Sequence, residues 1–259
     1  MKELFPFSFE EYCAFEKEKP SLNMVNNYLN FGGFPEYVST KNEEVLSRLL
    51  NDLLTRDIAV RYGVRDFRTL QRLTLFLLSN VSKLISANKL KIQFEVGSTS
   101  TILEYLSHLE TSYLLFFLPK FSYSIKKQDI NPRKVYAIDT GLVNVNSLSF
   151  SEDMGQKFEN IIYLYLRRKN DEIYYFSEKN ECDFVVFEKG KMKSCIQVCY
   201  ILNNDNLRRE ISGILEALDF FDQHEGTIVT LNQKDTIKQN DKVINVVAAY
   251  DFFVIGSPT

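Results

Sequence analysis

A helix followed by a β-hairpin in the second half of the chain constrains its fold more than any other feature. Residues 156–169 carry apolar side chains at the i, i+3, i+4, i+7 spacing of a helix with one buried face. Residues 182–187 and 193–200 are largely apolar and are separated by the polar segment 188–191, which predicts an antiparallel hairpin. A helix packed on paired strands predicts a layered α/β domain.

Polar residues occupy positions in this stretch that a packed core does not require. Glu159 lies at the edge of the apolar face of the predicted helix. If the hairpin turns near Gly190, Asp183 lies roughly opposite Gln197. Gln197 and Cys199 then share one face of the sheet, because side chains alternate along a strand. We therefore expect Glu159, Asp183 and Gln197 to converge beside Cys199.

These residues resemble the motif of the PD-(D/E)xK nuclease superfamily. Its members carry a Glu on the first helix, an Asp on a central strand and a Glu/Gln-x-Lys tripeptide on the next strand, which here would be Glu159, Asp183 and Gln197-Val198-Cys199. The resemblance implies a restriction-endonuclease-like fold, acids that hold Mg²⁺, and a lysine that positions the attacking water and balances charge. This chain departs from the pattern, because Cys199 stands at the lysine position and Gln197 is uncharged.

The departure predicts a degenerate site without catalysis of its own. Two carboxylates and an amide oxygen could still bind Mg²⁺, although more weakly than three carboxylates. Loss of one preorganised charge-stabilising group typically lowers the rate by about a hundred- to a thousandfold. The alternative is a Mg²⁺-dependent DNA endonuclease or exonuclease that recruits its cation from Lys193, Arg208 or Arg209.

Two segments near the start and one in the middle resemble a family of prokaryotic AAA-type ATPases with a C-terminal DUF4143 domain. They are residues 4–12 (LFPFSFEEY), 28–36 (YLNFGGFPE) and 135–142 (VYAIDTGL). The Gly-Gly pair in the second segment also fits a sharp turn after a helix over residues 24–30. We expect Asp139 in the third segment to cap or brace a turn rather than to catalyse.

The chain has no phosphate-binding loop of the form G-x₄-G-K-[S/T], so we expect no ATP-binding residues. By the resemblance it corresponds to the C-terminal part of such an ATPase, as a fragment or a truncated gene product. An ATPase domain encoded upstream would then be its partner.

Residues 63–148 predict a winged-helix domain. Helices are expected over 66–81, 84–90 and 98–110, with strands at 113–118 and 134–138. Basic residues in the ribbon could contact the phosphates of DNA, and they are Lys120, Lys126, Lys127, Arg133 and Lys134. The exposed side of the third helix carries Glu104 and Glu110, which repel phosphate. A solvated loop on a domain that packs against its neighbours is the alternative.

Composition adds general limits. The 45% hydrophobic and 25% charged residues are those of a globular chain, and no apolar run has the length of a membrane span. A net charge of −3 gives no overall attraction to nucleic acid, so DNA binding requires a local patch. Four scattered cysteines and two histidines predict reduced thiols, no structural zinc and a cytoplasmic location.

Together these patterns predict an α domain followed by an α/β domain. Residues 1–62 would be a helical connector left from an ATPase lid, 63–148 the winged helix, and 149–259 the nuclease-like domain with a mixed central sheet. DNA and the upstream ATPase are the expected partners, without a membrane, and Mg²⁺ is the cofactor considered.

Overall fold

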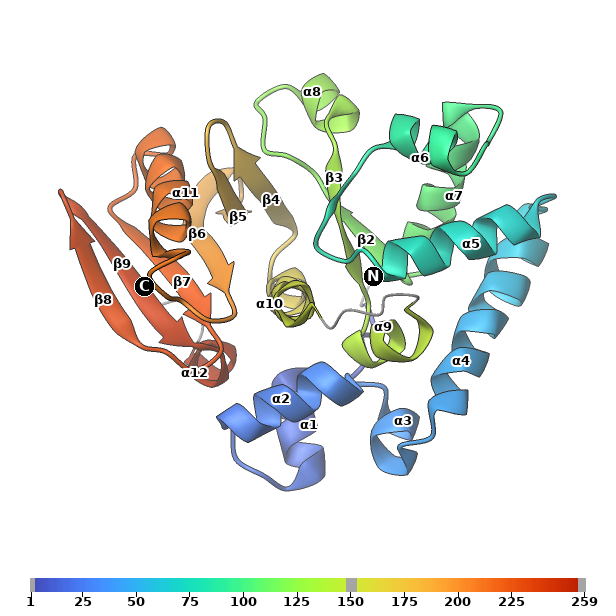
Figure 1. The fold of residues 1–259 in the computed structure, drawn as a ribbon, viewed down its shortest axis with the longest axis horizontal. Helices are drawn as coiled ribbons and strands as arrows, with labels where there is room; N and C mark the ends of the chain where they lie inside the picture. Colours follow the sequence, from blue (N-terminus) through green and yellow to red (C-terminus); the bar gives the residue numbers. More distant parts are fainter. Residues whose placement is uncertain (1–2, 148–152, 256–259) are drawn as a thin grey trace. The chain divides into compact units, whose positions relative to one another are not determined.

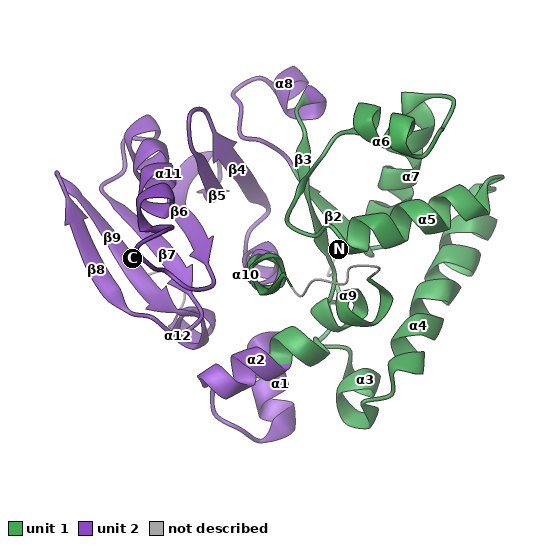
Figure 2. Ribbon diagram, in the orientation of Figure 1, with its two compact units in different colours: residues 1–7, 28–118, 131–160 green, residues 8–27, 119–130, 161–259 purple. Residues whose placement is uncertain are grey.

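The computed structural model describes residues 3–147 and 153–255, which form a mixed α/β structure of two compact units (Figures 1 and 2). Unit 1 comprises Met1–Phe7, Tyr28–Leu118 and Asn131–Asn160, and unit 2 comprises Ser8–Asn27, Pro119–Ile130 and Ile161–Thr259. The units therefore interleave along the sequence. The expected division at residues 62 and 148 stays a prediction.

Unit 1 consists of helices and a small antiparallel sheet (Figure 2). Its elements are α3 (Pro35–Thr40), α4 (Glu43–Asp52), the π-helix η1 (Leu53–Val60), α5 (Phe67–Leu78), β1 (Leu84–Ile85), α6 (Ala87–Gln93), α7 (Thr99–Thr111), β2 (Leu115–Leu118), β3 (Arg133–Ala137) and α9 (Thr140–Asn146). The strand order is β1-β3-β2, and both pairings are antiparallel. The helix expected over 84–90 is wrong at its start, because Leu84 and Ile85 pair with β3 and α6 begins only at Ala87.

Asp139 ties two distant segments of unit 1 together. Its Oδ1 accepts a 2.9 Å hydrogen bond from Leu142 N and caps α9, while its Oδ2 accepts a 2.6 Å bond from Gly33 N. Gly32 has a φ of +66°, and a Cβ on it would collide with the Asp139 carboxylate. The expected bracing role of Asp139 is confirmed, and the Gly-Gly pair is explained by this turn.

Unit 2 is built on a mixed sheet with the strand order β4-β5-β6-β7-β9-β8. Its elements are α1 (Phe9–Glu16), α8 (Ile125–Ile130), β4 (Glu172–Ser177), β5 (Glu181–Glu188), β6 (Lys191–Cys199), α11 (Leu207–Phe220), β7 (Glu225–Thr230), β8 (Asp235–Gln239), β9 (Lys242–Ala248) and α12 (Ala249–Ile255). Two helices, α2 (Leu22–Phe31) and α10 (Met154–Lys169), have residues in both units. Strands β6, β7 and β9 are parallel, and the other neighbours are antiparallel.

The two faces of this sheet are covered by different helices. Ile214 and Leu218 of α11 join a buried cluster with Val185 and Cys195 on one face. Phe184, the neighbour of Val185, points to the other face. Its ring centroid lies 6.2 Å from that of Tyr163 in α10. At one edge of the sheet, the short polar strand β8 pairs with β9. The expected mixed sheet is confirmed.

The hairpin of β5 and β6 has the expected register. Phe184 pairs with Ile196 and Val185 with Cys195, which continues to Asp183 opposite Gln197. The turn residues Lys189 and Gly190 both have positive φ, as in the tight turns that match strand twist. The expected register, with Asp183 opposite Gln197, is therefore confirmed.

Candidate functional site

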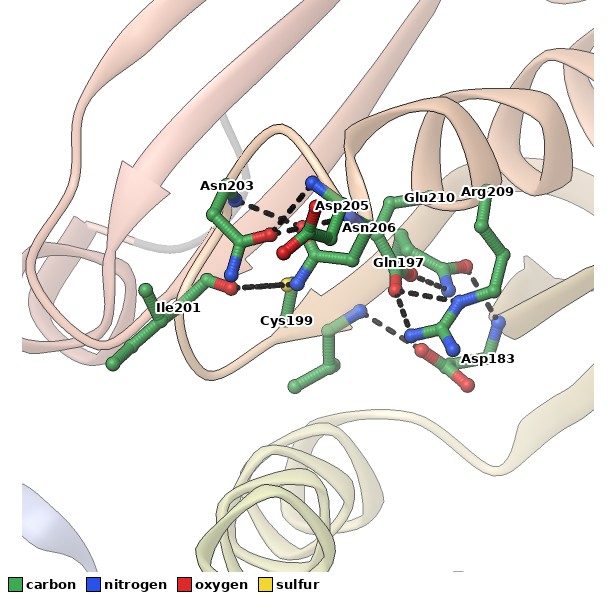
Figure 3. Close-up of polar contacts among 10 residues, drawn as sticks. Asp183, Gln197, Cys199, Ile201, Asn203, Asp205, Asn206, Arg209 and Glu210 are labelled. Atoms are coloured by element: carbon green, nitrogen blue, oxygen red, sulfur yellow. Dashed lines mark hydrogen bonds and ion pairs between the residues drawn. The ribbon is translucent and has the colours of Figure 1, made fainter.

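A buried polar network joins β5, β6 and α11 in unit 2 (Figure 3). Asp183 and Gln197 come from the two hairpin strands, and both are only 6% exposed. Asp183 N donates a 3.2 Å hydrogen bond to Gln197 Oε1, and Asp183 Oδ2 accepts a 2.9 Å bond from Val198 N. The bond from Val198 N to the Asp183 carboxylate thus joins β5 and β6 beyond the backbone pair of Phe184 and Ile196.

Glu210 in α11 completes the network and was not predicted. It is 2% exposed, and its Oε2 accepts a 2.6 Å hydrogen bond from Gln197 Nε2. Its Oε1 accepts a 3.0 Å bond from Arg209 Nε, and Arg209 points toward Asp183 and Gln197 in Figure 3. This hydrogen bond and the Glu210 charge raise the pKa of Arg209. The sequence could have indicated that Glu210 is buried, because it lies three residues after Leu207 and four before Ile214, on the apolar face of α11.

Close approach of α11 to the sheet buries this network. A Cβ on Gly213 would collide with the backbone carbonyl of Glu181 at the start of β5. Only glycine allows the helix to lie this near the strand. The approach brings Glu210 within reach of Gln197 and excludes water from both.

Cys199 occupies the position expected for a lysine, next to this network. It is 6% exposed, and its Sγ donates a 3.2 Å hydrogen bond to Ile201 O. Burial, followed by the charge of Glu210, raises the pKa of its thiol to about 11. The side chain is therefore neutral at pH 7, and it supplies no cation to a reacting group.

Cys199 is expected to react slowly with iodoacetamide at pH 8 while the chain is folded. Its pKa of about 11 replaces an ordinary value of 9.0. Two pKa units lower the thiolate fraction about a hundredfold, and the thiolate is the reactive form. Mass spectrometry of timed samples measures the rate, and the same chain in urea is the control. Equal rates in the folded and unfolded chain would contradict the pKa and the burial of Cys199.

Glu159, the third expected site residue, belongs to unit 1 and has partners there. Its Oε1 accepts a 2.7 Å hydrogen bond from Tyr136 Oη and lies 3.1 Å from Lys134 Nζ. Asp183 and Gln197 belong to unit 2, so the expected convergence of the three side chains stays a prediction.

The cations expected to replace the lysine differ in position. Arg209 lies at the network through its bond to Glu210. Lys193 lies toward the other end of β6, where its Nζ is 3.3 Å from Glu188 Oε2. Arg208 is exposed at the start of α11. Arg209 is therefore the basic residue of these three that the structure brings to the site.

The basic residues expected to bind nucleic acid do not form one ribbon. Residues 119–121 lie along β4, where Phe121 N donates a 2.7 Å hydrogen bond to Tyr175 O. The Phe121 ring stacks on Phe187 at 5.1 Å, and Lys120 Nζ lies 3.3 Å from Glu178 Oε1. The part of the expected ribbon that holds Lys120 is therefore packed on a sheet edge of unit 2.

The other four basic residues divide between exposed and buried positions. Lys126 and Lys127 are exposed on α8, and Arg133 is half-buried on β3. Lys134 is 2% exposed and ion-paired with Glu159. The expectation that Lys134 binds phosphate is therefore wrong, because its ammonium group is buried against a carboxylate.

The donors of unit 2 do not fit a magnesium site. Within residues 3–147 and 153–255, no group of three or more His, Cys, Asp or Glu side chains is placed to hold a metal ion. Gln197 Oε1 accepts the Asp183 N–H, and Asp183 Oδ2 accepts the Val198 N–H. Mg²⁺ requires several hard oxygens in octahedral geometry, and these two oxygens already accept backbone hydrogen bonds. The described helices also include none long and apolar enough to cross a bilayer.

Two uncharacterized proteins are similar to this chain in sequence. The chain is 34% identical over 275 residues to uncharacterized protein MJ1544 of Methanocaldococcus jannaschii, which covers 95% of this chain and 61% of that protein. An uncharacterized protein of Haemophilus influenzae is 27% identical over 177 residues, covering 64% of this chain and 44% of the relative. The chain thus spans about three fifths of the first relative and less than half of the second. No solved structure matches.

A family model decides the classification. Residues 22–153, just over half of the chain, match the model described as a domain of unknown function, DUF8612. The chain belongs to the DUF8612 family.

Proposed function

We propose that this chain is a nucleic-acid-binding region of a larger ATPase and has no catalytic activity of its own. In this proposal it combines a winged helix with a degenerate restriction-endonuclease-like domain. The resemblance of its three motifs to DUF4143-containing ATPases supports its place in a larger ATPase.

The observation that carries the proposal is the closed network of Gln197 and Glu210. Both ends of the Gln197 amide are engaged, and the Glu210 carboxylate is buried between Gln197 and Arg209. Cys199, at the lysine position, is a buried neutral thiol. Cleavage of a phosphodiester needs a preorganised cation or metal where charge develops. These residues bind one another instead, which supports the absence of cleavage.

The order of elements in unit 1 supports the winged helix. Helix α5 is followed by β1, α6, α7, β2 and β3, and the strand order is β1-β3-β2. The sequence order α10-β4-β5-β6-α11-β7 supports the nuclease-like domain in the same way. The order of the elements and the pairing of the strands are independent of the motif residues.

The third helix of the proposed winged helix is unsuited to reading bases. Glu104 and Glu110 are exposed on α7. His108 stacks on Tyr62 with ring centroids 3.9 Å apart, and burial lowers its pKa, so the imidazole is neutral at pH 7. Acidic and neutral groups give no attraction to a phosphate-lined groove. We therefore propose contacts to the phosphate backbone, without base-specific recognition.

The chain is expected to show no cleavage of single- or double-stranded DNA in Mg²⁺ or Mn²⁺. The reason is that Cys199 is neutral, that Arg209 is paired with Glu210, and that Gln197 Oε1 and Asp183 Oδ2 already accept hydrogen bonds. Fluorescently labelled DNA is incubated with the chain and with Asp183→Ala, and products are resolved on a denaturing gel. Metal-dependent cleavage by the wild-type chain that Asp183→Ala abolishes would overturn the proposal in favour of a nuclease.

A further inference from the structure

A group of exposed arginines lies in unit 1, outside the site of unit 2. Within residues 61–72, Arg61, Arg65, Arg68 and Arg72 are all exposed. Four arginines and one aspartate give this stretch a net charge of +3, whereas the whole chain carries −3. The stretch is therefore a strong local exception to the acidic balance of the chain.

None of the four guanidinium groups makes an ion pair with a carboxylate in the part of the chain that the structure describes. Arg56, on the preceding turn, shows the contrast, since its Nε lies 3.8 Å from Asp52 Oδ1. Asp66, the acidic residue among the arginines, is committed to capping α5, because its Oδ1 accepts a 3.0 Å hydrogen bond from Thr69 N. The pKa of Asp66 is lowered by this bond first and by the charges of Arg68 and Arg72 to a smaller extent.

Two of these arginines are held in place by aromatic rings. Arg61 Cζ lies 5.5 Å from the Tyr62 ring centroid, and Arg72 Cζ lies 5.7 Å from that of Phe94. A cation over a ring face is attracted to it, and the N–H edges of the guanidinium stay free to donate. Such a contact restricts the side chain, which lowers the entropy lost on binding, and the planar guanidinium matches a phosphate bidentately.

Helix geometry places two of the arginines together. Arg68 and Arg72 are four residues apart in α5, so they lie on the same side of the helix one turn apart. Arg65 precedes the helix cap, and Arg61 lies before Gly63. The group thus follows the first helix of the proposed winged helix rather than its ribbon or its third helix.

We propose that Arg61, Arg65, Arg68 and Arg72 form a surface that binds the phosphate backbone of duplex nucleic acid. The inference rests on the proposed function and locates its binding surface on residues different from those that the sequence predicted. Planar bidentate donors without carboxylate partners favour phosphate as the ligand.

The test compares two double variants that remove the same charge. Binding to a fluorescein-labelled 30-base-pair duplex is followed by fluorescence anisotropy from low to moderate salt. Arg68→Ala/Arg72→Ala is expected to weaken binding on the order of tenfold to a hundredfold and to reduce the slope of log K against log salt by about 1.8, or about 0.9 per lost phosphate contact. Lys19→Ala/Lys238→Ala, at two exposed positions of unit 2, is expected to leave the slope unchanged.

The possible results distinguish failure of the arginine surface from failure of the proposed function. If the wild-type chain does not bind duplex at low salt, nucleic-acid binding fails as a function. If it binds and the two double variants lose affinity equally, or Arg68→Ala/Arg72→Ala loses none, the arginine surface is wrong while the function stands. Displacement of the duplex by poly-glutamate at equal charge concentration would assign the arginines to acidic partners and overturn the phosphate inference. Circular dichroism checks that both variants are folded.

Discussion

Replacing Asp139 with alanine is expected to lower the free energy of unfolding by about 4 kcal/mol. Asp139 is 2% exposed, and its two oxygens accept buried hydrogen bonds from Gly33 N and Leu142 N. The alanine variant loses the cap of α9 and leaves the Gly33 N–H buried without this acceptor. Hydrogen bonds to a charged group contribute about 1.5–3 kcal/mol each, so the loss is a large part of a typical stability of 5–15 kcal/mol.

Asp66→Ala provides the matched control for Asp139→Ala. Both aspartates cap a helix, but Asp66 is exposed and its cap bond to Thr69 N is local. Loss of an exposed cap lowers stability by about 1 kcal/mol. Urea unfolding followed by circular dichroism measures both. If the two variants lose equal stability, the bond between Asp139 and Gly33 contributes nothing, and the explanation of the Gly-Gly turn fails.

Gln197→Leu is expected to lower the free energy of unfolding by about 3 kcal/mol. The substitution removes the donor 2.6 Å from Glu210 Oε2 and the acceptor of Asp183 N. Glu210 stays 2% exposed and keeps only its bond to Arg209 among the contacts described above. A buried carboxylate that loses a partner destabilises the fold strongly, because water cannot replace the missing donor.

A double-mutant cycle measures the contribution of this pair. Gln197→Leu/Glu210→Leu is expected to be about 2 kcal/mol more stable than the sum of the single variants predicts, because the double variant leaves neither polar partner behind. Gln239→Leu, on the exposed edge strand β8, is the control for glutamine to leucine in a strand and should stay within about 0.5 kcal/mol of wild type. Additive effects in the cycle would show that Gln197 and Glu210 are not coupled.

These stability measurements also bear on the proposed function. A coupled Gln197 and Glu210 pair would mean that the network acts as a structural brace between α11 and the sheet. Catalytic groups more often reduce stability, since they are held ready for substrate rather than satisfied within the protein. Strong coupling together with no cleavage would therefore support binding without catalysis.

Local patterns were enough for several parts of the fold. The alternation around Asp183 and Gln197 and the position of Gly190 fixed the hairpin register, because a slip of one residue would expose the buried face. The periodicity of α5, α7 and α10 located those helices to within a few residues. The role of Asp139 followed instead from the resemblance of residues 135–142 to a segment of the ATPase family.

Other parts depended on partners that are distant in sequence. Residues 119–130 were predicted as a basic ribbon, yet Phe121 packs among the aromatic rings of unit 2, including Phe187 and Phe221. A polar and basic composition did not reveal this, because two aromatic residues, Phe121 and Tyr123, and two backbone hydrogen bonds hold the segment on unit 2. Strand β8 escaped prediction for a similar reason, since its exposed polar residues pair with β9 only through the backbone.

The sequence by itself determined the mixed α/β class, the hairpin, and the neutral residues at 197 and 199 where the motif requires charge. Only the tertiary structure decided that Glu210 closes the network, that Lys134 is buried against Glu159, and that the arginines of 61–72 lack carboxylate partners within the described residues. The physical reason is that periodicity reports which face of an element is buried, whereas charge pairing depends on which elements meet.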